Sequence, residues 1–439
     1  MLVFKAHPAM RVFGSITVPG DKSISHRALM LSGIAEGSSE VSGFLASEDC
    51  LASLAAMRAL GVRIQQSSAT RVLVHGVGMR GLRQAGRALD MGNAGTAMRL
   101  FTGLLSAQKF DSQLIGDASL MKRPMERVAK PLRAMGADVR THNGTPPVDI
   151  VGVQALRGID YQMKMASAQV KSAILLAGLY ASGPTTIRAP AASRDHSERM
   201  LTSCGVKLQI DGLRITLHPP QRLMSQKITI PGDFSSAAFF IVAGLLAAPG
   251  EGLLIQNVGL NPTRIGLLSI LRSMGANIEI LDPRESGAEP VADLRVFASP
   301  LRGIAVPQDL VPLAIDELPV LFIAAACARG ETVVTGAEEL RVKESDRIAA
   351  MSAGLAALGV EHTALPDGMR IKGREQGSAF AGGAIDSFGD HRIAMSFAIA
   401  SLRATGPIEI RDVANVATSF PGFVPLAQSV GLAISESAV

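Results

Sequence analysis

Aromatic residues are scarce in this chain of 439 residues, which has no tryptophan, two tyrosines and an aromatic fraction of 4%. Proteins that bind single-stranded nucleic acid stack the bases on aromatic side chains, so the scarcity argues against that class. The formal net charge is +5, but lysine and arginine form no long cluster. The charge therefore fits an enzyme for small anionic metabolites better than a nucleic-acid-binding protein.

Cysteine is equally rare. The three cysteines, Cys50, Cys204 and Cys327, lie far apart and show no C-x-x-C spacing. We expect each to be a small buried residue in a protein of a reducing compartment, with no disulfide and no metal site. The sequence also lacks a P-loop, and we expect no cofactor.

Long apolar runs are missing too. The best candidate, Ala237–Ala248, ends at Pro249-Gly250 and falls short of the ~20 residues that a membrane-spanning helix needs. The segment Met1–Phe13 has no apolar core of a signal peptide. We therefore expect a cytoplasmic protein without a membrane segment. Because 439 residues exceed one ordinary core, two domains are expected.

One pattern occurs six times along the chain. A turn of small residues, an apolar helix, a glycine-containing turn and a β-branched strand follow one another at Gly20–Val41, Gly92–Ile115, Ser167–Ile187, Gly232–Ile255, Asp316–Val334 and Gly389–Ile410. Between these segments lies a second, amphipathic helix that usually ends at a glycine, as helices often do. The repeat is roughly 65 to 85 residues long, which exceeds a solenoid repeat. The pattern predicts an α/β fold of six two-helix modules.

The two halves of the chain open in the same way. Val18-Pro19-Gly20-Asp21 is echoed by Ile230-Pro231-Gly232-Asp233. Six modules divide into two groups of three, so we interpret both stretches as crossings between domains. One domain is predicted to combine residues 1–22 with 231–439, and the other to span residues 23–230.

The stretch Pro19–Leu31 is the most informative of the openings. An apolar helix begins there, flanked by Lys22 and Arg27, with Ser23 and Ser25 as candidate caps. A helix N-terminus carries unpaired N–H groups and about half a positive charge. With two cations beside it, this end predicts a site for a doubly charged anion. The alternative is an ordinary capped helix whose basic residues are solvated.

Further helix openings in the first half of the chain offer donors of the same kind. Small residues at Gly92–Arg99 let backbone N–H groups approach an anion closely. Cations or polar groups also stand at Lys122-Arg123-Pro124, at Ser167-Ala168-Gln169 and at Arg194–Glu198. Each has a structural alternative: tight helix–sheet packing, a solvated turn at a proline that begins a helix, a serine cap and a capping box, respectively.

Two openings in the second half carry charges of both signs. Lys343 and Arg347 are four residues apart, so they share a helix face and repel each other unless Glu344 and Asp346, or an anionic substrate, lie between them. The segment Ser387–Arg392 places an acid, an imidazole and a guanidinium at another helix start. We interpret both as parts of a site.

Asp316 and Glu317 lie in a strongly apolar stretch. Burial raises the pKa of a carboxyl group and nearby cations lower it, which is the balance that a general base requires. Capping of the following helix by Asp316 is the alternative. Taken together, the candidate segments contain many cations, few acids and no metal-ligand cluster. This set indicates an enzyme that binds two anions and transfers protons without a cofactor.

Four of these motifs resemble those of the 5-enolpyruvylshikimate-3-phosphate (EPSP) synthase family, in the same order along nearly the whole chain: Gly20–Arg27, Gly92–Arg99, Arg341–Arg347 and Asp390–Arg392. The resemblance implies two similar domains, each of three β-α-β-α-β-β units with pseudo-threefold symmetry, and an active site in the interdomain cleft. It implies transfer of the enolpyruvyl group of phosphoenolpyruvate to the 5-hydroxyl of shikimate 3-phosphate through a tetrahedral phosphorylated intermediate, without a metal or cofactor. A monomer is expected.

The resemblance also implies roles for single residues. Shikimate 3-phosphate would be held by Lys22, Ser23, Arg27, Ser167, Ala168, Gln169, Arg194, Asp316 and Lys343. Phosphoenolpyruvate would be held by Lys22, Gly95, Arg123, Gln169, Arg347 and Arg392. Asp316 would take the proton of the 5-hydroxyl, and Glu344 would donate one to the methylene carbon, with Lys22 and His391 assisting.

The sequence departs from the family pattern in places. Ala168 stands where many members have a second serine, and Thr418 stands where one branch has a lysine, so one contact is lost at each position. Together with Arg194-Asp195-His196, these residues resemble the branch that includes glyphosate-tolerant enzymes. Gly95, however, leaves room where tolerant members often carry alanine. Sensitivity to glyphosate stays open.

Two other classes are weighed against this interpretation. The related transferase that acts on UDP-N-acetylglucosamine uses a cysteine on a mobile loop, and none of the three cysteines falls in the corresponding stretch before Lys122. An RNA-end-processing protein built from related modules is opposed by the scarce aromatics and by the acid pair Asp316 and Glu344.

Overall fold

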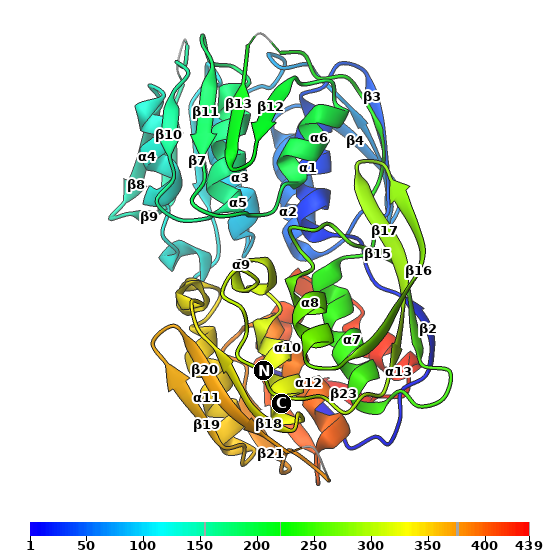
Figure 1. The fold of residues 1–439 in the computed structure, drawn as a ribbon. Helices are drawn as coiled ribbons and strands as arrows, with labels where there is room; N and C mark the ends of the chain where they lie inside the picture. Colours follow the sequence, from blue (N-terminus) through cyan, green and yellow to red (C-terminus); the bar gives the residue numbers. More distant parts are fainter. Residues whose placement is uncertain (153–154, 220, 375–376, 439) are drawn as a thin grey trace. The chain divides into compact units, whose positions relative to one another are not determined.

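The chain forms two compact units. The computed structural model describes residues 1–152, 155–219, 221–374 and 377–438. The first unit comprises Met1–Pro19, Pro231–Glu285 and Pro290–Val439, and the second comprises Gly20–Ile230 and Ser286–Glu289 (Figure 1). The chain thus leaves the first unit and returns to it at the two Pro-Gly stretches that the sequence repeats.

The second unit has three four-stranded sheets of one topology. Their strands, in spatial order, are β14 (Lys227–Thr229), β3 (Ser38–Ser42), β5 (Arg71–His75) and β4 (Arg63–Ser68); β6 (Leu89–Asp90), β7 (Ser112–Ile115), β9 (Thr145–Val151) and β8 (Asp138–His142); and β10 (Asp160–Gln162), β11 (Thr185–Arg188), β13 (Arg214–Leu217) and β12 (Leu208–Asp211). In each sheet the first two strands are parallel and the remaining pairs are antiparallel.

The helices of the second unit alternate with these strands. Three precede the strand next to the parallel edge of a sheet, namely α1 (Lys22–Gly33) before β3, α3 (Gly95–Leu105) before β7 and α5 (Ala168–Gly178) before β11. Three more come before the hairpin strands, namely α2 (Glu48–Ala59), α4 (Glu126–Ala134) and α6 (His196–Ser203), and a short 3₁₀ turn, η1 (Leu120–Lys122), precedes α4. The order β6-α3-β7-α4-β8-β9 is therefore one complete β-α-β-α-β-β module.

The first unit repeats this plan. Its sheets are β21 (Gly383–Asp386), β22 (Ile408–Arg411), β1 (Leu2–His7) and β23 (Ala433–Ala438); β16 (Asn277–Ser286), β17 (Glu289–Phe297), β15 (Leu253–Gly259) and β2 (Gly14–Thr17); and β18 (Gly330–Val334), β20 (Gly368–Gly373) and β19 (His362–Leu365). Beside β18, Ala305 forms a parallel bridge with Val333, where the other sheets have their parallel edge strand.

The helices of the first unit also fall into two sets. Before the strand next to the parallel edge come α7 (Phe234–Ala247), α10 (Leu318–Ala326) and α12 (His391–Ala400), and before the last strands come α8 (Gly266–Ser273), α11 (Arg347–Ala357) and α13 (Phe423–Ser429). Shorter turns are α9 (Val311–Ala314), η2 (Glu338–Val342), η3 (Ser401–Arg403) and η4 (Ala414–Thr418). The six predicted modules, and with them the α/β fold class, are confirmed.

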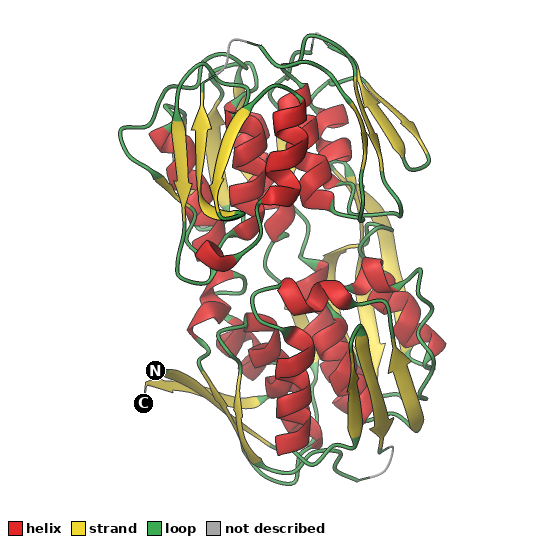
Figure 2. Cartoon of the chain, turned by 90° about the vertical axis from the view of Figure 1, so that its left-hand side faces the viewer, coloured by secondary structure: helices red, strands yellow, loops and turns green. Residues whose placement is uncertain are grey.

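The first helix of each module forms the interior of its unit. Every residue of α10 is buried, and so is nearly every residue of α7. A helix that is apolar all round can only be stable when it is covered on all sides. Within each unit, taken by itself, the sheets lie outside the gathered helices (Figure 2). Each unit has its own hydrophobic core, and no described helix is long and apolar enough to cross a bilayer.

Small residues let the interior helices approach each other closely. Gly103 of α3 faces α5, and a Cβ atom added there would stand 2.3 Å from the carbonyl oxygen of Ala173. Because real Cβ atoms never come so near to a backbone oxygen, only glycine fits without moving one helix. The abundance of glycine and alanine in the sequence thus serves close packing of these helices.

We expect Gly103→Ala to lower the free energy of unfolding by about 1–3 kcal/mol. Alanine would gain about 1 kcal/mol of helix propensity, but the clash with Ala173 outweighs this gain. Urea denaturation followed by circular dichroism measures the change. Gly86→Ala is the matched control, because a Cβ atom at that position meets no atom within 4 Å. Equal stability of wild type and Gly103→Ala would show that the helices can separate at no cost.

Candidate active site

Most of the predicted site residues lie at the starts of the interior helices. Lys22, Gly95 and His391 are the first residues of α1, α3 and α12, and Ser167 is the N-cap of α5. Asp316 stands two residues before α10 begins. Because the helix bodies are buried and apolar, the helix starts are where polar groups and unpaired N–H groups gather in each unit.

The start of α1 is capped by an acid. Asp21 accepts a hydrogen bond from the N–H of Ile24, so neither of the serines expected as caps has that role, and Ser25 is buried within the helix. Lys22 forms an ion pair with Asp49 of α2, at 2.9 Å between Nζ and Oδ2. A carboxylate suits this N-cap better than a hydroxyl because the helix dipole also stabilises its negative charge.

Arg27 ties three helix starts together in the second unit. Its Nε donates to Ser197 of α6 at 2.7 Å, NH2 donates to Ser172 of α5 at 2.8 Å, and NH1 donates to the carbonyl oxygen of Ser23 at 2.9 Å. The side chain is buried, and burial lowers the pKa of Arg27 to about 10. It remains a cation at neutral pH, so the N-terminal halves of α1, α5 and α6 meet around a positive charge.

The start of α6 differs from the capping box that the sequence suggested. Asp195 is the N-cap but makes no side-chain cap bond, and its carboxylate binds Arg199 at 2.9 Å instead. Glu198 forms a buried ion pair with Lys171 of α5, at 2.5 Å between oxygen and Nζ. Arg194 directly precedes this turn and is partly exposed. The acids at this helix start thus hold neighbouring cations, and the capping-box interpretation is wrong.

Gln169 joins the starts of α3 and α5. Its Oε1 accepts from Arg99 NH1 at 2.8 Å, and its Nε2 donates to the hydroxyl of Thr96 at 2.8 Å. Gly95 lies beside this contact: a Cβ atom added there would stand 2.9 Å from Arg123 NH1 and 3.1 Å from Arg99 NH1. The absence of a side chain at Gly95 is therefore what admits both guanidinium groups to this helix start.

Arg123 is held at the same place by the loop before α3. Its NH2 donates to Asn93 Oδ1 at 2.6 Å, and Asn93 in turn donates to Asp117 at 2.7 Å. The guanidinium is buried, whereas Lys122 is exposed. Pro124 does not begin a helix as the sequence suggested, because α4 starts at Glu126. Of the two adjacent cations, Arg123 is the one that the fold positions.

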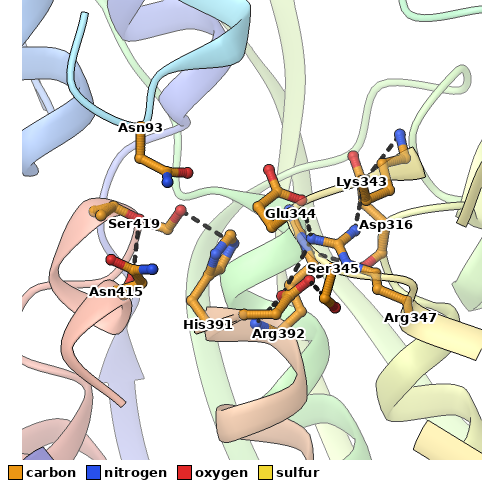
Figure 3. A network of polar contacts seen from close by, with 12 residues as sticks. Asn93, Asp316, Lys343, Glu344, Ser345, Arg347, His391, Arg392, Asn415 and Ser419 are labelled. Atoms are coloured by element: carbon orange, nitrogen blue, oxygen red, sulfur yellow. Dashed lines mark hydrogen bonds and ion pairs between the residues drawn. The ribbon is translucent and has the colours of Figure 1, made fainter. Parts of the chain in front are cut away.

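In the first unit, Arg347 is the centre of a cluster of acids (Figure 3). Only 1% of its side chain is exposed, and it meets Asp390 from Nε at 2.8 Å, Glu344 from NH2 at 2.6 Å and Asp316 from NH1 at 3.2 Å. Burial alone would lower the pKa of Arg347, but Asp390, Glu344 and Asp316 outweigh it and raise the pKa above its usual value. The two predicted catalytic acids are thus brought together on one cation.

Asp316 does not cap the helix that follows it. The N-cap of α10 is Glu317, without a side-chain cap bond, and the carboxylate of Asp316 faces Arg347 and Lys343, whose Nζ lies 3.6 Å away. Lys343 also pairs with Glu339 at 3.1 Å. The capping alternative is therefore wrong. Asp316, Glu344 and Lys343 all keep part of their side chains exposed.

His391 and Arg392 begin α12 beside this cluster. Asp390 caps the helix by accepting from the N–H of Arg392 at 2.9 Å, while Arg392 NH1 donates to the carbonyl oxygen of Asp316 at 3.0 Å. His391 Nε2 lies 3.1 Å from the hydroxyl of Ser419 (Figure 3). Asp316, Lys343, Glu344, Arg347 and Arg392 thus belong to one network, and His391 stands next to it in the chain.

Four residues that support the site were given no individual role from the sequence. Asp390 and Arg99 lie inside the quoted motifs but were not assigned, Asn93 lies in the glycine-rich loop, and Asp49 lies in an unremarkable helix start. Asp390 is fully buried and binds Arg347, Arg392 and Ser345. An acid directly before His-Arg at an apolar helix start was the available signal for it; nothing in the local sequence marks Asp49.

One glycine-rich turn follows a strand of the second unit. Gly76–Gly81 has the spacing G-x-G-x-x-G that dinucleotide-binding proteins use, and it follows strand β5. No helix begins directly after it, because strand β6 comes next and the following helix, α3, starts only at Gly95. The pattern therefore lacks the helix N-terminus that binds the pyrophosphate. An added Cβ at Gly76 would instead meet the backbone at the end of α1, so this glycine serves packing.

The cysteines are buried, as expected. Burial raises the pKa of Cys204 to about 11 and that of Cys327 to about 12, and it raises the pKa of Cys50 still further above its usual value. Thiols of such high pKa are poor nucleophiles at neutral pH. Among the described residues, no group of three or more His, Cys, Asp and Glu side chains is placed to hold a metal ion.

These two clusters differ in the chemistry that they allow. The second unit offers lysine, arginine, hydroxyl and amide donors at helix starts, which suits the binding of phosphate and carboxylate groups. The first unit offers two partly exposed carboxylates on a buried arginine, with a lysine and a histidine nearby, which suits proton transfer. An enzyme that binds anionic substrates and moves protons between them needs both.

The fold defines the class of the protein. The enolpyruvyl transferase NikO from Streptomyces tendae superposes with a TM-score of 0.79 over 100% of this chain and 99% of its own, at 17% identity, which shows a common fold. EPSP synthase from Acinetobacter baumannii superposes with a TM-score of 0.90 at 52% identity, covering all of both chains. The chain is an α/β protein with the enolpyruvyl transferase fold.

The family follows from the sequence comparisons. The model of EPSP synthase (3-phosphoshikimate 1-carboxyvinyltransferase) matches residues 7–426. A 3-phosphoshikimate 1-carboxyvinyltransferase of Methylococcus capsulatus is 58% identical over 99% of both chains, and one of Alkalilimnicola ehrlichii is 55% identical over 99% of this chain and 96% of its own. The chain belongs to the EPSP synthase family.

His26, in the motif at the start of α1, makes stability depend on pH. Burial, with Lys22 and Arg27 nearby, lowers the pKa of His26 to about 3, whereas an unfolded histidine titrates near 6.5. Between these two values the unfolded chain binds the extra proton. We therefore expect the free energy of unfolding to be unaffected by His26 above pH ~6.5. As the pH falls toward 3, protonation of this histidine in the unfolded chain should lower the free energy of unfolding by at most ~1.4 kcal/mol per pH unit.

Urea denaturation of His26→Asn at several pH values between 4 and 7 tests this expectation, because asparagine can keep a hydrogen bond to Ser53 but does not titrate. The variant should lose stability less steeply than wild type as the pH falls. His142→Asn, which removes an exposed histidine of the same unit, should follow the wild-type slope. Parallel curves for wild type and His26→Asn would contradict the assignment.

Proposed function

We propose that this chain catalyses the transfer of the enolpyruvyl group of phosphoenolpyruvate to the 5-hydroxyl of shikimate 3-phosphate, with release of phosphate. The observation that carries the proposal is the pair Asp316 and Glu344 on the buried Arg347, in a chain that belongs to the EPSP synthase family. An enol ether is made only if a weakly nucleophilic hydroxyl loses a proton and the methylene carbon gains one, and a pair of carboxylates supplies both steps.

Shikimate 3-phosphate is proposed to bind mainly at the helix starts that meet around Arg27. Lys22 and Ser167 stand at the first turns of α1 and α5, which Arg27 joins through Ser172. Converging N–H groups with a lysine suit a phosphate monoester. The full set proposed for this substrate is Lys22, Ser23, Arg27, Ser167, Ala168, Gln169, Arg194, Asp316 and Lys343. Ala168 has no side-chain donor and would contribute its backbone.

Phosphoenolpyruvate is proposed to bind to the arginines and to the start of α3. Arg123 lies against Gly95, and Gln169 stands at the same helix start. In the described part of the chain, the hydrogen bonds and ion pairs of the Arg392 guanidinium use NH1 alone, so its Nε and NH2 edge can take an anion. The full set is Lys22, Gly95, Arg123, Gln169, Arg347 and Arg392.

The two carboxylates have complementary tasks in the proposal. Asp316, beside Lys343 and Arg347, accepts the proton of the 5-hydroxyl as the oxygen attacks C2 of phosphoenolpyruvate. Glu344 donates a proton to C3, which becomes a methyl group in the tetrahedral intermediate. Loss of a proton from that methyl group and of phosphate from C2 then forms the product. Lys22 and His391 assist these transfers.

Residues of both units are proposed to serve this one reaction, since the second unit supplies anion-binding groups and the first supplies the acids. We propose that the enzyme acts as a monomer in the cytoplasm, and that no metal or cofactor takes part. The alternatives weighed from the sequence gain no support from the site: the cysteines are buried with raised pKa values, and aromatic side chains are scarce.

Phosphate release with phosphoenolpyruvate and shikimate 3-phosphate, in the presence of a chelator, tests the function. We expect turnover by wild type and a loss of a hundredfold or more in kcat for Asp316→Ala and for Glu344→Ala, because general acid–base steps contribute ~10²–10⁴ in rate. Arg123→Ala, which removes a buried arginine of the second unit, should mainly raise KM for phosphoenolpyruvate.

Glu338→Gln is the matched control for loss of an acid near the cluster, since Glu338 is exposed at the start of η2. It should keep near-normal kinetics. Circular dichroism and thermal melting of every variant separate a catalytic loss from a loss of folding. Near-normal rates for both Asp316→Ala and Glu344→Ala would end the acid–base assignment, and no turnover by wild type would end the proposed reaction.

A further inference from the structure

A second buried polar network lies behind the acids of the first unit. Glu317 and Arg264 are 2% and 3% exposed, and both stand in the apolar interior close to the start of α7. The mechanism proposed above uses neither residue. A buried carboxylate and a buried guanidinium are costly unless they hold each other and their neighbours in place, so their task needs an explanation.

A serine connects the two charges. Arg264 NH2 donates to the Oγ of Ser235 at 2.6 Å and to Asp233 Oδ1 at 3.1 Å. Because an arginine can only donate, the hydroxyl hydrogen of Ser235 is left to point at Glu317 Oε1, with which it forms a hydrogen bond. Asp233 is the N-cap of α7 and Glu317 is the N-cap of α10, so the network joins the starts of two interior helices.

The network reaches the third interior helix through Arg392. Glu317 Oε1 lies 3.8 Å from Arg392 NH1, the same nitrogen that donates to the carbonyl oxygen of Asp316 at 3.0 Å. Asp316 through its backbone and Glu317 through its side chain thus both hold NH1 of Arg392. The charges of Arg264 and Arg392 are balanced by those of Glu317 and Asp233.

We propose that Glu317 is a positioning residue for phosphoenolpyruvate: together with Ser235 and Arg264 it fixes the guanidinium of Arg392, so that Nε and NH2 face the substrate. This inference rests on the proposed function. A planar guanidinium binds a carboxylate or phosphate tightly only when its orientation is set beforehand. Glu317 sets it from the NH1 side, opposite the edge that the anion takes.

Two effects of Glu317 on anion binding oppose each other. Its negative charge repels a bound anion, which would favour removal of the charge, whereas its hold on Arg392 favours binding. The ion pair with Arg392 spans 3.8 Å, while an anion on the far edge of the guanidinium is more distant from Glu317, so its repulsion by Glu317 is weaker. The hold should therefore dominate, and loss of the charge should weaken binding of phosphoenolpyruvate.

Steady-state kinetics of Glu317→Gln test the proposal, because glutamine keeps the shape and the acceptor for Ser235 but removes the charge. We expect KM for phosphoenolpyruvate to rise about tenfold, with KM for shikimate 3-phosphate within twofold of wild type. Ser235→Ala, which breaks the bridge and leaves both charges, should raise KM for phosphoenolpyruvate about threefold to fivefold. Glu331→Gln, which removes an exposed acid paired with Arg370 in the same unit, is the control and should leave both constants unchanged.

The outcomes are distinguishable. If wild type shows no turnover with the two substrates, the proposed function fails and this inference with it. If wild type turns over but KM for phosphoenolpyruvate is unchanged or lowered in Glu317→Gln, or if both substrates are affected equally, the positioning role alone is overturned. Thermal melting checks folding, and unfolding of both Glu317→Gln and Ser235→Ala would likewise overturn the proposal, since the network would then serve stability only.

Discussion

The ion pairs of Arg347 are the constraint on which the candidate site depends. A buried guanidinium is tolerated only with counter-charges in direct contact, and removal of one partner from such a cluster typically costs several kcal/mol. Arg347 has Asp390 beneath it and Glu344 and Asp316 at its more exposed side. The positions of the two acids are therefore set by the same energy that folds the first unit, before any substrate is bound.

The module explains why polar groups collect where they do. Interior helices that are apolar all round leave only their starts for charges, and each start brings unpaired N–H groups. In the second unit Arg27 and Gln169 join such starts by hydrogen bonds, and in the first unit Arg392 and Glu317 do so. One architectural rule, repeated in each module, thus produces an anion-binding cluster in one unit and an acid–base cluster in the other.

The sequence predicts the parts of this arrangement that are local. The helix pattern and the glycine turns are short-range, and they reveal the modules, the fold class, the helix starts at Lys22, Gly95 and His391, and a further start close to Asp316. Contacts such as Lys171 with Glu198, Lys22 with Asp49 and Ser235 with Glu317 join residues that only the packing of the modules brings together. The capping rule also failed where a cation was within reach: Asp195 and Asp316 resemble caps, but Asp195 pairs with Arg199 one helical turn away and Asp316 pairs with the distant Arg347.

The number of donors on an arginine separates the tasks of Arg27, Arg347 and Arg392. A guanidinium has five N–H groups. Within the described part of the chain, Arg27 donates three of them to protein acceptors, one from each nitrogen, so one N–H remains on each terminal nitrogen although the side chain is buried. Arg347 donates four N–H bonds to the carboxylates of Asp390, Asp316 and Glu344, so it mainly fixes the positions of these acids. Arg392 spends one on the protein, at NH1, and that nitrogen is held by Asp316 and Glu317. Of these three arginines, Arg392 therefore keeps the most N–H groups for an anion. Because so few protein contacts fix its orientation, it depends most on the buried network of Glu317, Ser235 and Arg264.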